Sequence, residues 1–84
     1  MVINSSLPPN IENTLRVSPN SIAVKREVRD VLWPGNARVK EILRGEEHIM
    51  PEGGTVLHAD DVLMIVVKTD EPEKIREELM NIVQ

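Results

Sequence analysis

Arg44 is a residue whose type and position suggest binding chemistry. It stands immediately before Gly45 in a predicted turn, and its guanidinium carries a fork of N–H donors that suits phosphate. The alternative is a surface ion pair with Glu46 or Glu47, which follow in the same stretch. Both interpretations stay open on the sequence alone.

Three other basic residues share this ambiguity. Lys25 and Arg26 stand near the expected start of a short helix, and Arg16 stands near the end of a strand-like run. Each is either a contact for a bound anion or a solvated surface charge.

Two histidines raise the question of a metal site. His48 and His58 have acidic neighbours at Glu46, Glu47, Asp60 and Asp61, and borderline metals bind imidazole and carboxylate together. The histidines fall on different predicted elements, however, and carboxylates beside turns are ordinarily solvated. The chain has no Cys, which excludes a thiolate zinc site. We therefore predict no metal site.

Catalytic signatures are also missing. A hydrolytic site needs a nucleophile, a base and an orienting group in one cleft. Ser21 or Thr55 could join a histidine only on paper, because no motif supports either residue. The four glycines do not form a G-x-G-x-x-G dinucleotide loop. We predict that the chain is not an enzyme and carries no resident cofactor.

Composition limits the class of partner. The 84 residues are enough for one small domain, and one Trp with no Phe or Tyr provides no aromatic platform for stacking single-stranded nucleic acid. A net charge of −4 gives no general basic surface for nucleic acid. No apolar run approaches the roughly 20 residues that span a bilayer. We expect a cytoplasmic chain that binds no nucleic acid and does not insert into a membrane.

The first third of the chain is expected to hold an arm, a strand and a short helix. Residues 1–13 contain Pro8–Pro9 and little apolar content, which predicts an extended arm or linker before a domain over 14–84. Residues 14–17 suit a short strand. Residues 22–33 match a helical stripe better than a two-residue alternation, with Ser21 as its N-cap and Pro34 after its end.

The middle of the chain reads as closely spaced strands. Residues 37–44 and 47–50 predict a hairpin, 55–57 a short extended piece, and 62–67 a strand. Because 62–67 is apolar throughout, we expect it to be buried on both faces. The short turns between these runs predict an antiparallel meander.

The C-terminal residues predict an amphipathic helix packed on this sheet. An apolar stripe recurs at helical spacing from Ile75 to Val83, and Asp70 with Glu73 resembles a capping box around Pro72. The expected fold is therefore small α+β: an antiparallel sheet of about four to five short strands, a short helix after the first strand, and this C-terminal helix.

The order of these elements resembles the TrkA-C domain, the C-terminal ligand-sensing half of the RCK modules that regulate potassium transport. The resemblance covers roughly residues 14–83. The residues that carry it are Ser21, Val24–Lys25–Arg26, Val28, Leu32, Pro34, Val39, Ile42, Arg44–Gly45, Ile49, Pro51, Gly53, Thr55, Leu57, Ala59–Asp60–Asp61 and the run 62–67. The stretch from Arg44 to Leu57 is also similar to cytosolic tails of some bacterial ClC-type chloride channels.

Two positions depart from the family pattern. The family often has Gly where this chain has Lys25, and commonly has A-G-D where this chain has Ala59–Asp60–Asp61. Asp tolerates a positive φ better than most residues, so Asp60 is compatible with a tight backbone. The bulk and charge of Lys25 are expected to change any pocket or interface at that position.

The resemblance implies a regulatory domain that dimerises beneath a membrane transport protein, either a potassium system or a ClC-type chloride transporter. It permits a nucleotide ligand such as cyclic di-AMP across the dimer interface. The candidate contacts are Arg16, Val24, Lys25 and Arg26, with Arg44 and Pro51 as outer positions. The alternative is a structural module that pairs subunits and binds no small molecule.

Overall fold

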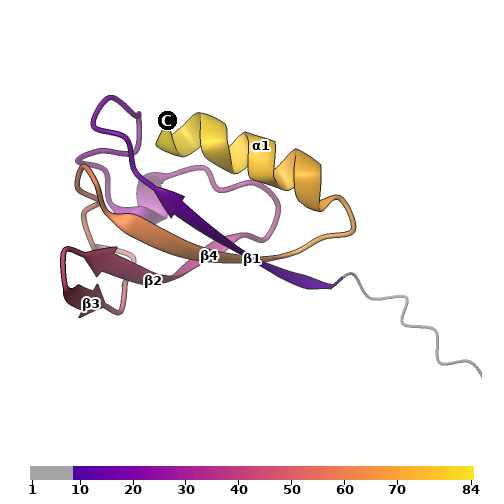
Figure 1. Cartoon of the computed structure of the whole chain (residues 1–84), viewed down its shortest axis with the longest axis horizontal. Coiled ribbons are helices and arrows are strands. Elements are labelled where there is room, and N and C mark those ends of the chain that lie inside the picture. The colour runs from indigo at the N-terminus through magenta and orange to yellow at the C-terminus, as the bar shows by residue number, and fades with distance from the viewer. Residues whose placement is uncertain (1–8) are drawn as a thin grey trace, which may run out of the picture.

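The computed structural model describes residues 9–84. The elements in chain order are β1 (Asn10–Arg16), the 3-10 helix η1 (Val28–Asp30), β2 (Arg38–Arg44), β3 (Glu47–Ile49), β4 (Val62–Lys68) and α1 (Pro72–Val83). One four-stranded antiparallel sheet is covered on one face by α1 (Figure 1). The predicted α+β class is confirmed.

Strand β1 begins earlier than the sequence suggested. It starts at Asn10, so residues 10–13 of the expected arm belong to the sheet. Asn10 faces Lys68 and Arg16 faces Val62 in the β1–β4 register. Residues 1–8 of the expected arm lie outside the described residues.

Strand β4 is central, although it is the last strand in the chain. The sheet order is β1-β4-β2-β3, so β4 pairs with β1 on one side and with β2 on the other. The hairpin of β2 and β3 was predicted correctly, with Ile42 opposite Ile49. The simple meander was a wrong prediction, because the most apolar strand takes the interior position, where both of its edges are hydrogen-bonded.

The two faces of β4 differ in burial. Leu63, Ile65 and Val67 are buried, whereas the alternate residues Val62, Met64 and Val66 are only partly buried. Burial on both faces was therefore a wrong prediction for this chain. We call the side of the sheet away from α1 the open face.

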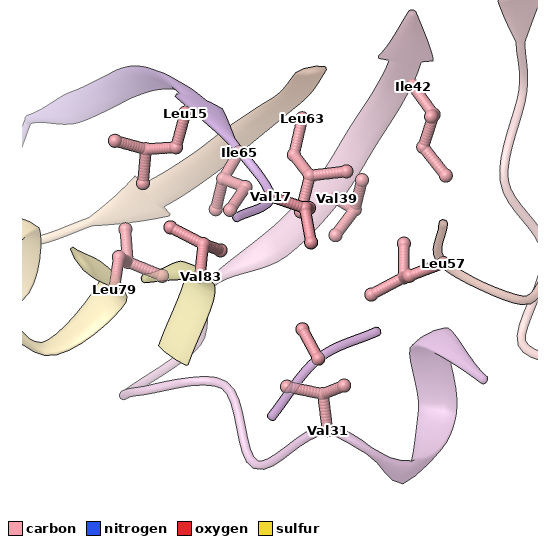
Figure 2. Close-up of a cluster of buried hydrophobic side chains, with 11 residues drawn as sticks. Leu15, Val17, Val31, Val39, Ile42, Leu57, Leu63, Ile65, Leu79 and Val83 are labelled. Atoms are coloured by element: carbon pink, nitrogen blue, oxygen red, sulfur yellow. The ribbon is translucent and has the colours of Figure 1, made fainter. Parts of the chain in front are cut away.

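The core lies between the sheet and a layer formed by α1 together with the loop segments that carry Val31 and Leu57 (Figure 2). Leu79 and Val83 of α1 point toward Leu15 and Ile65 of the sheet, and burying each such side chain contributes about 1.5–3 kcal/mol. Arg76 Nη1 also donates to Asn13 Oδ1 at 3.1 Å, which ties the helix to β1. The buried hydrophobic cluster is Leu15, Val17, Ala23, Val31, Val39, Ile42, Leu57, Leu63, Ile65, Leu79 and Val83.

A β-bulge interrupts the pairing of β2 with β4. Val39 faces Ile65 and Glu41 faces Met64, so Lys40 is an extra residue in β2. The bulge lets both Val39 and Ile42 reach the buried side, although they are three positions apart. Lys40 and Glu41 are consequently outside the core.

The predicted helix over 22–33 is reduced to the single 3-10 turn η1. Lys25 N donates to Leu57 O at 2.8 Å, and Leu57 N donates to Arg26 O at 2.8 Å. Val28 N donates to Thr55 O at 2.8 Å, and Glu27 forms an isolated bridge with Val56. These backbone groups bond across to 55–57, so they are not available for helical bonds four residues back.

Ser21 does not cap a helix. Its hydroxyl is buried and makes no hydrogen bond within the described residues. Lys25 interrupts any helix here as well, because its φ of 71° lies in the left-handed region.

The start of α1 differs from the predicted capping box. Glu71 occupies the N-cap position without a side-chain cap bond, and Pro72 is the first helical residue. Thr69 Oγ1 accepts a hydrogen bond from Glu71 N at 2.9 Å. Asp70 as the N-cap was therefore a wrong prediction, because Thr69 fixes the approach to the helix instead.

Candidate functional site

The turn before η1 brings together three of the predicted contact residues. An open depression of about 720 Å³ is lined by Val24, Lys25, Arg26, Glu27, Asp30 and Val56. Its rim carries two cations and two carboxylates. We call this depression the turn site.

Backbone geometry fixes the turn site. The positive φ of Lys25 reverses the chain, and the bonds of Lys25 and Arg26 to Leu57 hold that reversal against the 55–57 segment. Arg26 Nε donates to Ile22 O at 2.9 Å, so the Arg26 side chain is folded back along its own turn. This hydrogen bond is solvent-exposed, so a bound anion can compete for the guanidinium.

An apolar groove adjoins the turn site. It encloses about 260 Å³, and its lining residues are Ile22, Ala23, Arg26, Asp30, Val31, Leu32 and Ile82. Ile22 is 64% exposed and Leu32 is 92% exposed, which is unusual for large aliphatic side chains. Arg26 and Asp30 line both hollows, so the groove and the turn site form one continuous surface.

Arg44 has an internal partner. Its Nε donates to Asp61 Oδ1 at 2.8 Å, its Nη2 donates to Asp61 Oδ2 at 2.9 Å, and Nη2 also donates to Val56 O at 3.0 Å. Of the two interpretations left open, the surface pair with Glu46 or Glu47 is not what the structure shows, because the ion pair of Arg44 is with buried Asp61. Because Val56 lines the turn site, the hydrogen bond from Arg44 to its carbonyl supports the wall of that site.

Asp61 is a buried carboxylate held in its charged form. Burial alone would raise the pKa of Asp61, but hydrogen bonds from the Arg44 guanidinium and from His58 N outweigh that effect. The pKa of Asp61 therefore lies below its ordinary value. The same hydrogen bond raises the pKa of Arg44, so both members of the pair stay ionised.

The remaining predicted contacts lie apart from the turn site. Arg16 Nε donates to Asp60 Oδ1 at 3.0 Å, and these two exposed side chains form an ion pair. Pro51 is partly buried after β3. Neither Arg16 nor Pro51 lines the turn site or the groove.

The histidines are separated as well. His48 Nδ1 lies 2.8 Å from Glu41 Oε2 across the β2–β3 hairpin, whereas His58 is exposed in the loop before β4. Within residues 9–84 there is no group of three His, Asp or Glu side chains that could hold a metal ion. In the same range no helix is long and apolar enough to cross a membrane.

Sequence reasoning missed two features of this region. It included Val31 and Leu32 in the predicted helix over 22–33, but the extended chain there buries Val31 and exposes Leu32. It also treated Asp61 as a solvated boundary residue. The sequence offered no local signal for this burial, because Asp60 lies in a turn with a φ of 69° and Asp61 is turned inward by its pairing with distant Arg44.

Comparisons with known proteins agree with this architecture. A family model described as the TrkA-C domain matches residues 14–80. The Trk system potassium uptake protein TrkA homolog of Archaeoglobus fulgidus is 36% identical over 58 residues, which cover 69% of this chain and 13% of that protein. The chain thus corresponds to a small part of that relative.

A solved structure described as an RCK domain with cda has the same fold. It superposes with a TM-score of 0.60 at 20% identity, covering 77% of this chain and 94% of the other. The family model extends over most of the described residues, including the end of β1, the turn site, the central strand β4 and most of α1. This chain belongs to the TrkA-C domain family.

Proposed function

We propose that this chain is a non-catalytic, cytosolic regulatory domain of a membrane potassium transport system. In this proposal it forms a homodimer and binds a small ligand at the turn site. The relative from Archaeoglobus fulgidus is a potassium uptake protein, which favours a potassium system over a ClC-type chloride transporter as the host. The membrane partner would be the transport protein that this domain regulates.

The observation that carries the proposal is the continuity of the apolar groove with the turn site. Exposed Ile22 and Leu32 offer an apolar surface to a second copy, and Arg26 at the shared rim offers charge to a ligand. A ligand held at such a rim would contact both copies of the dimer. It would regulate transport only if it bound one arrangement of the dimer better than another.

We take cyclic di-AMP to represent the proposed class of nucleotide ligands. Its phosphates would contact Lys25 and Arg26, and its bases would lie on the aliphatic side chains around Val24 and Ile22. The solved neighbour of the same fold is described as containing cda, which supports a ligand-binding role for this architecture. The turn site is not lined by Arg16, Arg44 or Pro51, so any effect of these residues on the ligand would be indirect.

Thermal unfolding with and without cyclic di-AMP tests the proposal. A ligand at about one hundred times its Kd stabilises the fold by about 2.7 kcal/mol, which is a rise in Tm of roughly ten degrees or more for a domain of this size. Arg26→Gln should abolish the rise. Lys74→Gln is the matched control, because it removes one positive charge from the exposed side of α1.

The purely structural alternative predicts a different result. A pairing module without a ligand would show no rise in Tm with cyclic di-AMP or other nucleotides, although it would still dimerise. A rise that survives in Arg26→Gln would place the ligand elsewhere on the molecule.

A further inference from the structure

A second polar hollow lies on the open face, at the end of the sheet where β1 begins and β4 ends. It encloses about 620 Å³. Its lining residues are Asn10, Glu12, Asn36, Arg38, Lys40, Val66, Val67 and Lys68. We call it the sheet-end site; it shares no lining residue with the turn site.

Strand register builds this site from three strands. Arg38 of β2 faces Val66 of β4, and Lys68 of β4 faces Asn10 of β1. The alternation of β4 places Lys68 on the same side as Val66, opposite to buried Val67. Arg38 and Lys68 therefore converge over Val66 from neighbouring strands.

The β-bulge supplies the third cation. Lys40 is the extra residue of β2, and its side chain lines the same hollow as Arg38. Bulges re-aim side chains and are over-represented beside functional sites. Here the bulge adds a positive charge to a face that already carries two.

Charge in the sheet-end site is unbalanced. Three cations face a single carboxylate, Glu12, and none of these four side chains forms an ion pair within residues 9–84. The chain as a whole has a net charge of −4, so this cluster opposes the general charge of the molecule. Like charges held together without counter-charges favour the binding of an anion.

Amide groups complete the lining. Asn36 Oδ1 accepts a hydrogen bond from Lys68 N at 2.9 Å, which fixes the amide and leaves its NH2 group as a donor. Asn10 supplies a second side-chain amide at the same edge. Cations together with amide donors form a set that suits phosphate oxygens.

We propose that the sheet-end site binds a soluble anion that carries two or more phosphate groups. Its three cations come from two neighbouring strands, and linked phosphates offer separate oxygens to each of them. A hollow of this volume is in the range of small-ligand sites. The concave shape and the acidic net charge of the chain favour a free phosphate compound over an anionic membrane surface. This inference goes beyond the proposed function and does not rest on it.

Amide chemical-shift titration of the full chain with inorganic pyrophosphate tests this proposal. The amides of Arg38, Lys40 and Lys68 should shift, whether or not those of Lys25 and Arg26 at the turn site also respond. Lys40→Gln should weaken pyrophosphate binding by about two- to fivefold, in line with one exposed charge contact. Glu12→Gln should strengthen it, because the only carboxylate of the site is removed.

Matched controls distinguish a specific binding site from general electrostatic attraction of pyrophosphate to the chain. Lys74→Gln gives the same net charge as Lys40→Gln but lies on α1, so its affinity for pyrophosphate should be unchanged. Equal weakening in the two variants would overturn the proposal, and so would shifts confined to the turn site. The amide spectrum of each variant also reports whether it is folded.

Sedimentation with lipid vesicles distinguishes the source of the phosphate. Vesicles of phosphatidylcholine with about one quarter phosphatidylglycerol should not sediment the chain at physiological ionic strength. Sedimentation that depends on Lys40, without any response to pyrophosphate, would overturn the proposal in favour of a lipid surface.

Discussion

Asp61 joins three segments of the chain through one buried residue. Its carboxylate accepts hydrogen bonds from Arg44 and from His58 N, and its carbonyl accepts one from Val17 N at 2.8 Å. The loop before β4, the end of β1 and the end of β2 are therefore positioned together. The wall of the turn site depends on this pair, because Arg44 also holds Val56 O.

Asp61→Asn should lower the free energy of unfolding by roughly 2–4 kcal/mol. The amide can still accept from His58 N, but it leaves the Arg44 guanidinium, whose side chain is 30% exposed, without its counter-charge. Urea unfolding followed by Trp33 fluorescence measures the change. Asp60→Asn is the matched control; Asp60 has a φ of 69° and an exposed side chain, so a change below about 1 kcal/mol is expected.

Stability should fall in acid because of the same carboxylate. The pKa of Asp61 is lower in the folded chain than in the unfolded chain, so its contribution is fully present above the unfolded pKa of about 4. That contribution is lost as the pH falls further, through the folded pKa. The free energy of unfolding, measured from pH 6 down to pH 2, should decline less steeply in Asp61→Asn than in the original chain. Parallel declines would contradict this role.

The segment between β1 and β2 is organised by one strained residue. Lys25 adopts a left-handed φ of 71°, which costs a non-glycine residue about 1–2 kcal/mol, and the bonds to 55–57 hold it there. The family pattern often has Gly here. The strain in this chain therefore accompanies a charged side chain at the rim of the turn site.

Substitutions at Lys25 test the strain directly. Lys25→Gly should leave stability unchanged or raise it by up to about 1 kcal/mol, because relief of strain is partly offset by unfolded-state entropy. Lys25→Val should destabilise the chain by about 1–2 kcal/mol, since a β-branched residue tolerates positive φ poorly. Thermal unfolding of the two variants side by side gives the difference. Equal stability would mean that the left-handed turn is not retained in solution.

Helix α1 contributes through its buried face. Leu79 is fully buried against the sheet, and Leu79→Ala should cost roughly 2–4 kcal/mol through lost contacts and the cavity left behind. Glu77→Ala, on the exposed side of the same helix, should change stability by less than about 0.5 kcal/mol. Chemical denaturation of both variants checks the contrast.

Elements with strong local patterns were predictable, and those fixed by distant contacts were not. The apolar run of β4 and the stripe from Ile75 to Val83 identify their own elements. The short helix was overestimated because Val24 and Val28 fit a helical stripe, whereas their backbone is bound to residues far along the chain. No pattern in the sequence predicted the β-bulge at Lys40.

For the candidate site, residue types were predictable but their partners were not. Lys25 and Arg26 line one hollow with Val24, whereas Arg16, which the family resemblance grouped with them, lies apart from it. Arg44 belongs instead to Asp61, 17 positions away, and no local spacing specifies such a pair. The sheet-end site needs the β1-β4-β2 order, which the meander expectation did not contain.

At the scale of the whole molecule, the groove at Leu32 predicts association. Dimerisation through this groove should make Tm rise by several degrees over about a hundredfold range of protein concentration. Leu32→Glu should remove that dependence. Met50→Glu is the matched control, because Met50 is also exposed, at 72%, but does not line the groove. Sedimentation equilibrium of both variants gives the oligomeric state directly.

The position of β4 also has a consequence for how the chain folds. Apart from the β2–β3 hairpin, every pairing in the sheet waits for residues 62–68, and β1 must close a loop of about fifty residues to meet them. A chain emerging from the ribosome therefore leaves β1 and one edge of β2 unpaired until residues 62–68 have been synthesised. Folding should be one late, non-local step, slower than in helical domains of equal length.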